Sequence, residues 1–362
     1  MKKVLSLVLA LALIVSIFSM AVAEEKTYSF EIVSKGFQST YWQAVLAGCK
    51  SETEKINTEA GYELVKFNMV GPDSESDIAV QVNEFESALN AKPDAIGLAA
   101  LDVNALNANI AAAKEAGIPI IGFDSGVPNA PEGAVLANAS TNNYAAGSVV
   151  AENLYAKIKA RIAAATAPVR VGEINQDATS ESITNRGLGF IDKFIELAAA
   201  DGYKVAVIGN EKYVNDSKGD KAAEADANII IEVRVPAQTT TELCATEAGV
   251  VLNEADTIAI FGSNQVSAEG IITANETLNM CGSEDTQIIA VGFDSGTVIK
   301  AAVTAGTMFG AVTQSPVGIG QKLIDLLLAA AKGEAVADTD TGCAFYTAAN
   351  IASDEIAPNL YD

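Results

Sequence analysis

The stretch IPIIGFDSG at residues 118–126 and the stretch IIAVGFDSG at residues 288–296 decide the fold. In each of them, an apolar run typical of a buried strand ends in the same five residues, so that Asp124 and Asp294 both follow a strand. Chance is one explanation, because Gly, Ser and Asp are common turn residues. The other explanation is functional, because α/β sheets bind ligands beyond the carboxyl ends of their strands.

On both sides of these stretches, short apolar segments alternate with longer helical patterns. Besides the two stretches themselves, strands are expected at residues 28–34, 62–70, 94–100, 169–174, 204–208, 228–235 and 256–263. Helices are expected from about residue 41 and at residues 78–90, 106–116, 144–160, 185–200, 242–253 and 268–278, with a polar bridge at 137–143. This alternation predicts an α/β fold of two Rossmann-like lobes, each with a parallel sheet and right-handed crossovers.

The first residues have the pattern of a secretory signal peptide at residues 1–23. A basic start, MKK, is followed by an apolar run at residues 4–18 and by Ala-Val-Ala at residues 21–23. A retained membrane anchor is the alternative, but the run is shorter than the roughly 20 residues that a spanning helix needs. We therefore expect a chain exported to the periplasm or cell envelope and starting near Glu24.

Composition removes several classes of function. The formal net charge of −23 argues against nucleic acid and anionic membrane surfaces as partners. The chain has no histidine, which is the commonest general base and metal ligand, and it has no C-x-x-C pair. No enzymatic activity, cofactor or metal is therefore predicted. The pairing of the four cysteines, Cys49, Cys244, Cys281 and Cys343, stays open.

Further motifs join the two aspartates in a recognisable order. KGFQSTYWQAV at residues 35–45 leads into two aromatic residues at the start of the first helix, Asn264 follows a strand in FGSNQ, and Gln314 lies in TQSP. With Asp124 and Asp294 in place, the sequence resembles the type I periplasmic sugar-binding proteins, the ribose- and galactose-binding group of ABC importers. The resemblance covers nearly all of the chain after the predicted signal peptide, and it implies a ligand cleft between two lobes.

The resemblance also implies how the chain is divided. It places residues 24–140 plus 315–342 in an N-terminal lobe, residues 141–314 plus 343–362 in a C-terminal lobe, and the helix at 316–332 on the first. The lobes are then joined by a three-strand hinge with crossings near residues 140–142, 314–315 and 341–344. The role of a polar insertion at residues 210–228 stays open.

The candidate ligand-binding residues come from the same resemblance. They are Ser39, Thr40, Tyr41, Trp42, Asp124, Ser125, Thr184, Gln238, Asn264, Asp294 and Gln314. Carboxylates accept hydrogen bonds from adjacent hydroxyls, amides both donate and accept, and aromatic rings offer flat faces to a sugar ring. The expected ligand is therefore small, neutral and polyhydroxylated. A core position under the first helix is the alternative for Trp42.

Three departures from the family pattern concern the ligand. The family's sugar binders usually carry an arginine directly after the first aspartate, where this chain has Ser125. A second family arginine falls near Thr184, while Arg186 matches a neighbouring, more structural arginine. Residues 236–241 (PAQTTT) replace an aromatic residue and an aspartate that the family often has there. Losing two rigid donors leaves a pentose, hexose, deoxy-sugar or nucleoside open as the ligand.

The predicted function is that of an exported, monomeric solute-binding protein that delivers a sugar-like molecule to an ABC permease. A receptor that presents a bound sugar or nucleoside-type signal to a chemoreceptor or sensor kinase is the alternative, since it would use the same cleft. A glycosidase with Asp124 and Asp294 as its carboxylate pair is disfavoured, because their separation would change with closure. Regulators of the lac-repressor type have similar lobes but carry an N-terminal DNA-binding segment where this chain has the predicted signal peptide.

Overall fold

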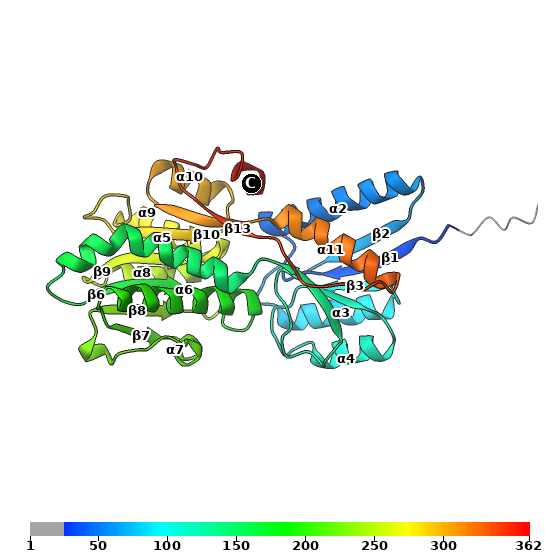
Figure 1. Ribbon diagram of the computed structural model, residues 1–362, viewed down its shortest axis with the longest axis horizontal. Coiled ribbons are helices and arrows are strands. Elements are labelled where there is room, and N and C mark those ends of the chain that lie inside the picture. The colour runs from blue at the N-terminus through cyan, green and yellow to red at the C-terminus, as the bar shows by residue number, and fades with distance from the viewer. Residues whose placement is uncertain (1–24) are drawn as a thin grey trace, which may run out of the picture.

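The computed structural model describes residues 25–362 and consists of two lobes (Figure 1). The predicted signal peptide at residues 1–23 lies outside the described residues. Each lobe contains one mainly parallel sheet with helices on both of its faces. The predicted fold class, α/β with two Rossmann-like lobes, is therefore confirmed.

The first lobe is built on a six-stranded parallel sheet in the order β12-β5-β4-β3-β1-β2. Its strands are β1 (Tyr28–Val33), β2 (Val65–Val70), β3 (Ala95–Leu98), β4 (Ile120–Phe123), β5 (Val135–Ser140) and β12 (Thr339–Asp340). Its helices are α2 (Thr40–Ala60), α3 (Ile78–Asn90), α4 (Asn107–Glu115) and α11 (Pro316–Ala331). Successive strand residues point to opposite faces, so Ile32 packs under α2 and α11 whereas Val33 packs under α3 and α4.

The second lobe is built on a seven-stranded sheet in the order β13-β11-β10-β9-β6-β8-β7, in which only β13 is antiparallel. Its strands are β6 (Val169–Ile174), β7 (Val205–Gly209), β8 (Ile229–Arg234), β9 (Thr257–Gly262), β10 (Ile289–Phe293), β11 (Gly310–Gln314) and β13 (Cys343–Tyr346). Its helices are α5 (Asn143–Ala164), α6 (Glu181–Ala200), α7 (Glu211–Asp216), α8 (Thr241–Leu252), α9 (Gln265–Leu278) and α10 (Thr297–Ala305). One face packs against α5 and α6, and the other packs against α8, α9 and α10.

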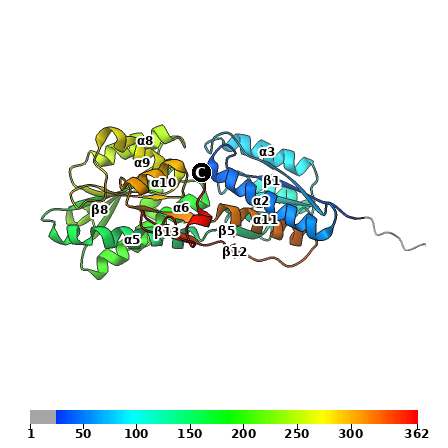
Figure 2. The ribbon, with the colours of Figure 1, turned by 90° about the horizontal axis from the view of Figure 1, so that it is seen from above.

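Within residues 25–362, the chain passes between the two sheets three times. The links are residues 141–142 between β5 and α5, Ser315 between β11 and α11, and residues 341–342 between β12 and β13. Although α11 follows a strand of the second sheet, it packs on the first sheet and on α2 through residues such as Leu323. Figures 1 and 2 show the two lobes side by side, with the C-terminal end of the chain at their junction.

Glycines let the paired helices of each lobe approach closely. A Cβ atom on Gly48 of α2 would lie 2.1 Å from the backbone oxygen of Val317 in α11, and one on Gly320 would lie 2.1 Å from the backbone oxygen of Val45. In the second lobe, Gly147 of α5 meets α6 in the same way, with 2.0 Å to the Arg186 oxygen. The backbones therefore touch at these crossings, which fixes the helices against their sheets.

The structure differs from the sequence-based expectations in two segments. The first residues of the predicted polar bridge at 137–143 belong to the strand β5. This strand was not expected, because its inward residues Ala137 and Ala139 are too small to give a strong apolar pattern. The insertion at residues 210–228 contains α7 and a 3-10 turn, and it buries Tyr213, whose hydroxyl donates to the Asp177 backbone oxygen at 2.9 Å. This insertion is therefore packed onto the second lobe.

Candidate ligand-binding site

A cavity lies between the lobes, where the carboxyl ends of strands from both sheets meet. From the first lobe it is lined by Lys35, Ser39, Tyr41, Trp42, Glu75 and Asp124. From the second lobe it is lined by Gln176, Ser182, Ile183, Arg186, Asn264, Gln265, Val266, Asp294 and Gln314. About 40 Å³ of the cavity is free, which is room for only a few water molecules, so a sugar ring requires the wall residues to move apart.

The two GFDSG stretches form matching turns at the ends of β4 and β10. Asp124 and Asp294 both have positive φ values, +53° and +73°, a backbone conformation that Asp tolerates better than most residues. The backbone N–H of Asp124 donates to the Ala139 oxygen at 3.0 Å, and that of Asp294 donates to the Val312 oxygen at 2.7 Å. In each lobe the turn is thus tied to the neighbouring strand, and its carboxylate lies in the wall of the cavity.

The Asp124 carboxylate is held by an aromatic residue of α2. The Tyr41 hydroxyl donates to Asp124 Oδ1 at 2.5 Å, and both side chains are buried. Burial raises the pKa of the Asp124 carboxyl to about 6, although Lys35, Tyr41 and Arg186 act in the opposite direction. A buried carboxylate with few fixed partners can gain much from hydroxyl donors on a ligand.

The Asp294 carboxylate is held by two groups of its own lobe. Gln314 Nε2 donates to Asp294 Oδ1 at 2.7 Å, and the backbone N–H of Gln265 donates to Oδ2 at 3.1 Å. Burial raises the pKa of this carboxyl, against the effects of Arg186 and these donors. Because Gln265 begins α9, the carboxylate also lies at a helix N-terminus, where a negative charge is favoured.

The penultimate residue, Tyr361, packs beside the second GFDSG turn. Its backbone N–H donates to Ser295 Oγ at 2.9 Å and its backbone oxygen accepts from Gly296 N at 3.1 Å, which anchors it to the second GFDSG turn. Its ring meets the ring of Tyr41 edge-on, with 5.8 Å between the ring centres. Tyr361 is therefore fixed on one lobe and packs against the other.

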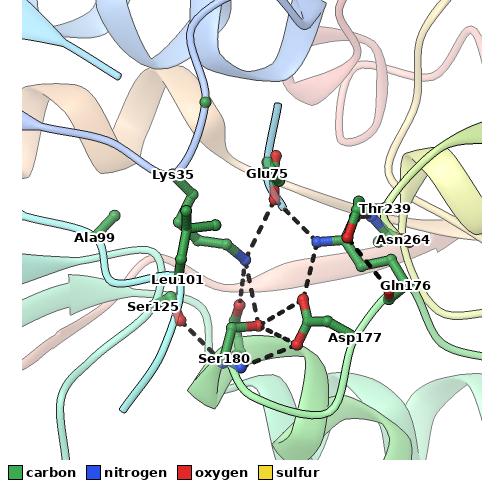
Figure 3. A network of polar contacts seen from close by, with 12 residues as sticks. Lys35, Glu75, Ala99, Leu101, Ser125, Gln176, Asp177, Ser180, Thr239 and Asn264 are labelled. Atoms are coloured by element: carbon green, nitrogen blue, oxygen red, sulfur yellow. Dashed lines mark hydrogen bonds and ion pairs between the residues drawn. The ribbon is translucent and has the colours of Figure 1, made fainter. Parts of the chain in front are cut away.

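A polar network crosses the cavity between the lobes (Figure 3). Glu75 accepts from Trp42 Nε1 at 2.8 Å and from Gln176 Nε2 at 2.9 Å, and the Lys35 ammonium lies 3.5 Å from the same carboxylate. Lys35 also reaches the hydroxyls of Ser180 and Ser182 of the opposite lobe, at 3.4 Å each. These contacts show the lobes closed on each other around the cavity.

The charge of Lys35 is balanced by carboxylates. Burial alone would lower the pKa of its ammonium group, but Glu75, Asp177 and Asp124 outweigh burial, so that the pKa is raised. Lys35 therefore stays protonated and offers a charged donor at the cavity wall, although only 2% of its surface is exposed.

Arg186 is a second buried cation in the wall. Its guanidinium donates to Asn143 Oδ1 at 2.6 Å and to the Ser263 backbone oxygen at 2.6 Å, and it stacks on the Phe293 ring at 3.6 Å. These contacts fix the plane of the guanidinium group. Its charge acts on both cavity aspartates and lowers the pKa of each relative to the effect of burial alone.

The sequence matches the family profile of the periplasmic binding protein domain over residues 30–335. The chain belongs to this family. A comparison with curated proteins finds no match. Of the residues that the structure describes, no helix is long and apolar enough to cross a membrane, and no group of three or more Asp, Glu or Cys side chains is placed to hold a metal ion.

Several solved structures resemble this periplasmic binding protein. A protein from Brachyspira murdochii, described as an ABC transporter and LacI family transcriptional regulator, is 33% identical, with a TM-score of 0.75; the match covers 93% of this chain and 99% of that one. An ABC transporter solute-binding protein from Agrobacterium vitis with bound D-fucose is 27% identical, with a TM-score of 0.75 and coverage of 92% and 100%. A carbohydrate transporter solute-binding protein from Agrobacterium radiobacter, in complex with D-arabinose, is 26% identical, with a TM-score of 0.72 and coverage of 94% and 100%.

Seven of the eleven candidate residues from the sequence line the cavity of this periplasmic binding protein. They are Ser39, Tyr41, Trp42, Asp124, Asn264, Asp294 and Gln314. Trp42 is only 2% exposed and contacts Phe123 edge-on, so it belongs to the core of the first lobe and to the cavity wall at once. The two interpretations of Trp42 are therefore compatible.

Two more candidates join the lobes outside the cavity lining. Thr40 Oγ1 accepts from Gln265 Nε2 at 3.2 Å, and Ser125 Oγ accepts from the backbone N–H of Ser182 at 3.2 Å. Both bonds connect a residue of the first lobe to one of the second. Their hydroxyls are thus already engaged in contacts between the lobes.

The structure does not bring Thr184 and Gln238 to the cavity. The Thr184 hydroxyl donates to the Ser180 backbone oxygen at 2.8 Å inside the first turn of α6, because the helix begins earlier than expected, at Glu181. Gln238 is exposed, and its neighbour Thr239 donates through its backbone N–H to Ser76 Oγ at 2.7 Å. The loop that carries Gln238 therefore contacts the rim of the other lobe.

Sequence reasoning missed several charged and polar residues of the wall. Lys35 follows β1 by two residues and Gln176 follows β6 by two residues, so the rule that led to the aspartates also applies to them. Glu75 lies in the loop between β2 and α3, again beyond the carboxyl end of a strand. Arg186 sits one turn into α6, where its inward direction depends on how the helix packs.

Proposed function

We propose that this periplasmic binding protein captures a small, neutral, sugar-like solute between its lobes and delivers it to an ABC permease. The observation that carries the proposal is that Asp124 and Asp294, from opposite lobes, reach one cavity. Carboxylates form charge-assisted hydrogen bonds with hydroxyls, so a ligand with hydroxyls on two sides would connect both lobes. Ligand binding would then favour the closed arrangement, as in hinge closure.

The remaining wall suits a hydroxylated ring. Gln314 is 2% exposed, and its Oε1 has no hydrogen-bond partner among residues 25–362, so this acceptor is free for a ligand hydroxyl. Tyr41 and Trp42 supply aromatic surface, and Lys35 and Arg186 supply donors. The two cations replace, from other positions, the arginines that the sequence lacks at residues 125 and 184.

The similar solved structures support a monosaccharide. Two of them, at 27% and 26% identity, are described with bound D-fucose and D-arabinose. Both compounds are single neutral rings with adjacent hydroxyls, which is the chemistry that a pair of carboxylates and amides recognises. We therefore infer a monosaccharide of pentose or deoxyhexose size as the first class of ligand to test.

Three further statements belong to the same proposal. Residues 1–23 would direct export to the periplasm or cell envelope, and the protein would act there as a monomer. It would bind its ligand without catalysis, because the carboxylates stand on opposite lobes and the chain has no histidine to assist them. Nucleic acid is not expected as a partner, because the net charge is −23.

Binding and closure can be measured directly. The protein would be denatured and any released small molecule identified by mass spectrometry, and the intact protein would be titrated calorimetrically with D-arabinose, D-fucose and adenosine. We expect saturable binding of at least one sugar and a smaller radius of gyration in X-ray scattering when that sugar is present. Binding of the nucleoside alone would refute the sugar class, and binding without any change in radius would refute closure.

A further inference from the structure

Glu75 uses both of its carboxylate oxygens in contacts that belong to different lobes. It lies in the loop between β2 and α3 of the first lobe, with its side chain 18% exposed. Oε1 accepts from a residue of its own lobe, and Oε2 accepts from a residue of the second lobe. Glu75 is thus a single side chain at which the two walls of the cavity meet.

The contact within the first lobe holds the indole of Trp42. Trp42 Nε1 donates to Glu75 Oε1 at 2.8 Å, and the ring is 2% exposed. Gly36 leaves room for this pair, because a Cβ atom there would lie 3.2 Å from Glu75 Cγ and 3.2 Å from Trp42 Nε1. The indole N–H is therefore oriented by a charged acceptor, and this contact does not require the second lobe.

The contact with the second lobe continues to a candidate ligand residue. Gln176 Nε2 donates to Glu75 Oε2 at 2.9 Å, and the oxygen of the same Gln176 amide accepts from Asn264 Nδ2. Gln176 is 1% exposed, and its Nε2 also donates to Asp177 Oδ2 at 3.2 Å, so loss of Glu75 leaves one of its two N–H groups buried without a partner. The Lys35 ammonium, 3.5 Å from Glu75 Oε2, balances the charge of this carboxylate.

We propose that Glu75 is a positioning residue that couples the aromatic wall of the first lobe to the amide wall of the second when the lobes close. This inference rests on the proposed function. Glu75 acts through Trp42 and Gln176: the bond to Trp42 exists in either arrangement of the lobes, whereas the bond to Gln176 forms only on closure. On closure, Glu75 binds Gln176, which in turn orients Asn264. The carboxylate that orients Trp42 therefore also orients Asn264.

A glutamine at this position cannot do both tasks. Trp42 Nε1 and Gln176 Nε2 bond to different oxygens of Glu75, so a glutamine in the same orientation presents its oxygen to one of these donors and its NH₂ group to the other. It also leaves the Lys35 ammonium beside a neutral group. Glu75→Gln keeps the shape of the side chain, which makes it the sharpest test of the carboxylate.

The first measurement needs no ligand. Trp42 is the single tryptophan of the chain, so a ¹⁵N-labelled sample gives one indole N–H cross-peak after removal of bound solute. We expect Glu75→Gln to shift this peak in the ligand-free protein and Gln176→Leu to leave it in place, because the lobes are then open. Glu86→Gln, an exposed carboxylate on α3, is the matched control with the same change of charge. An unmoved peak in Glu75→Gln would overturn the proposal.

The second measurement tests the coupling with D-arabinose and D-fucose. We expect Glu75→Gln and Gln176→Leu each to weaken binding of the accepted sugar by about tenfold to a hundredfold, mainly through faster dissociation. The double variant should be little worse than either single one, because both remove the same bond. Effects that multiply in the double variant would overturn the coupling. If the wild type binds neither sugar, the proposed sugar class fails instead, and the indole peak still decides whether Glu75 positions Trp42.

Discussion

The buried Glu173 makes a strong prediction about stability and pH. This residue is the last but one of β6, with none of its surface exposed. Its Oε1 accepts from Asn175 Nδ2 at 2.7 Å, and its Oε2 has no hydrogen-bond partner among residues 25–362. Burial raises the pKa of the carboxyl to about 8 from an ordinary value of 4.5, with a smaller contribution from the charge of Asp192.

The sign of the effect follows from the protons bound in each state. Between pH 4.5 and pH 8 the folded protein keeps a proton on Glu173 that the unfolded chain has lost, so the free energy of unfolding falls as the pH rises through this window. At pH 7 the gap from the ordinary pKa is about 2.5 units, and each unit corresponds to about 1.4 kcal/mol. Glu173 therefore costs the native state about 3 kcal/mol at pH 7, and little near pH 4.5.

Glu173→Gln should remove this pH dependence. The amide has the shape of the protonated acid and keeps the oxygen that accepts from Asn175, but it cannot ionise. The difference in the free energy of unfolding between the variant and the wild type at pH 4.5 is the baseline. At pH 7 we expect this difference to be about 3 kcal/mol more in favour of the variant than at pH 4.5. Urea unfolding at pH 4.5, 6, 7 and 8 measures this difference. The control variant is Glu254→Gln, at an exposed residue of the same lobe, whose difference in unfolding free energy from the wild type should not change with pH. A difference in unfolding free energy between Glu173→Gln and the wild type that does not change with pH would refute the reasoning.

Three other predictions concern the site and the helix crossings. Asp124→Ala and Asp294→Ala should each weaken sugar binding by several kcal/mol if ligand hydroxyls are left buried and unpaired. If both variants bind with normal affinity in calorimetry, the GFDSG stretches are turns without a role in binding. Trp42 emission should shift saturably with the bound sugar and stop responding in Asp294→Ala, whereas a silent Trp42 during calorimetric binding would remove it from the site. Gly48→Ala should destabilise the first lobe by about 1–3 kcal/mol, because its Cβ would meet the α11 backbone at 2.1 Å. Gly249→Ala is the control, because a Cβ atom there would have no neighbouring atom within 4 Å, and it should be neutral or stabilising in thermal unfolding.

The amino-acid sequence alone determined the fold class, because its signals are local. Apolar runs such as those before Asp124 and Asp294 alternate with helical patterns, and this order is sufficient to predict parallel sheets in two lobes. The position of both aspartates at strand ends could be read in the same way. The strand β5 was hidden, because Ala137 and Ala139 are too small to give an apolar pattern, and only pairing with its neighbours made it a strand.

Only the tertiary structure decided which polar side chains share the cavity. Glu75 and Gln176 are 101 positions apart and come together because two sheets, joined by three links, bring their strand ends face to face. Thr184 shows the reverse, since its place in the first turn of α6 directs its hydroxyl to the helix backbone. Sequence spacing fixes where a residue lies along its own strand or helix. The direction in which a side chain points, and what it meets there, depends on packing between elements that are distant in the chain.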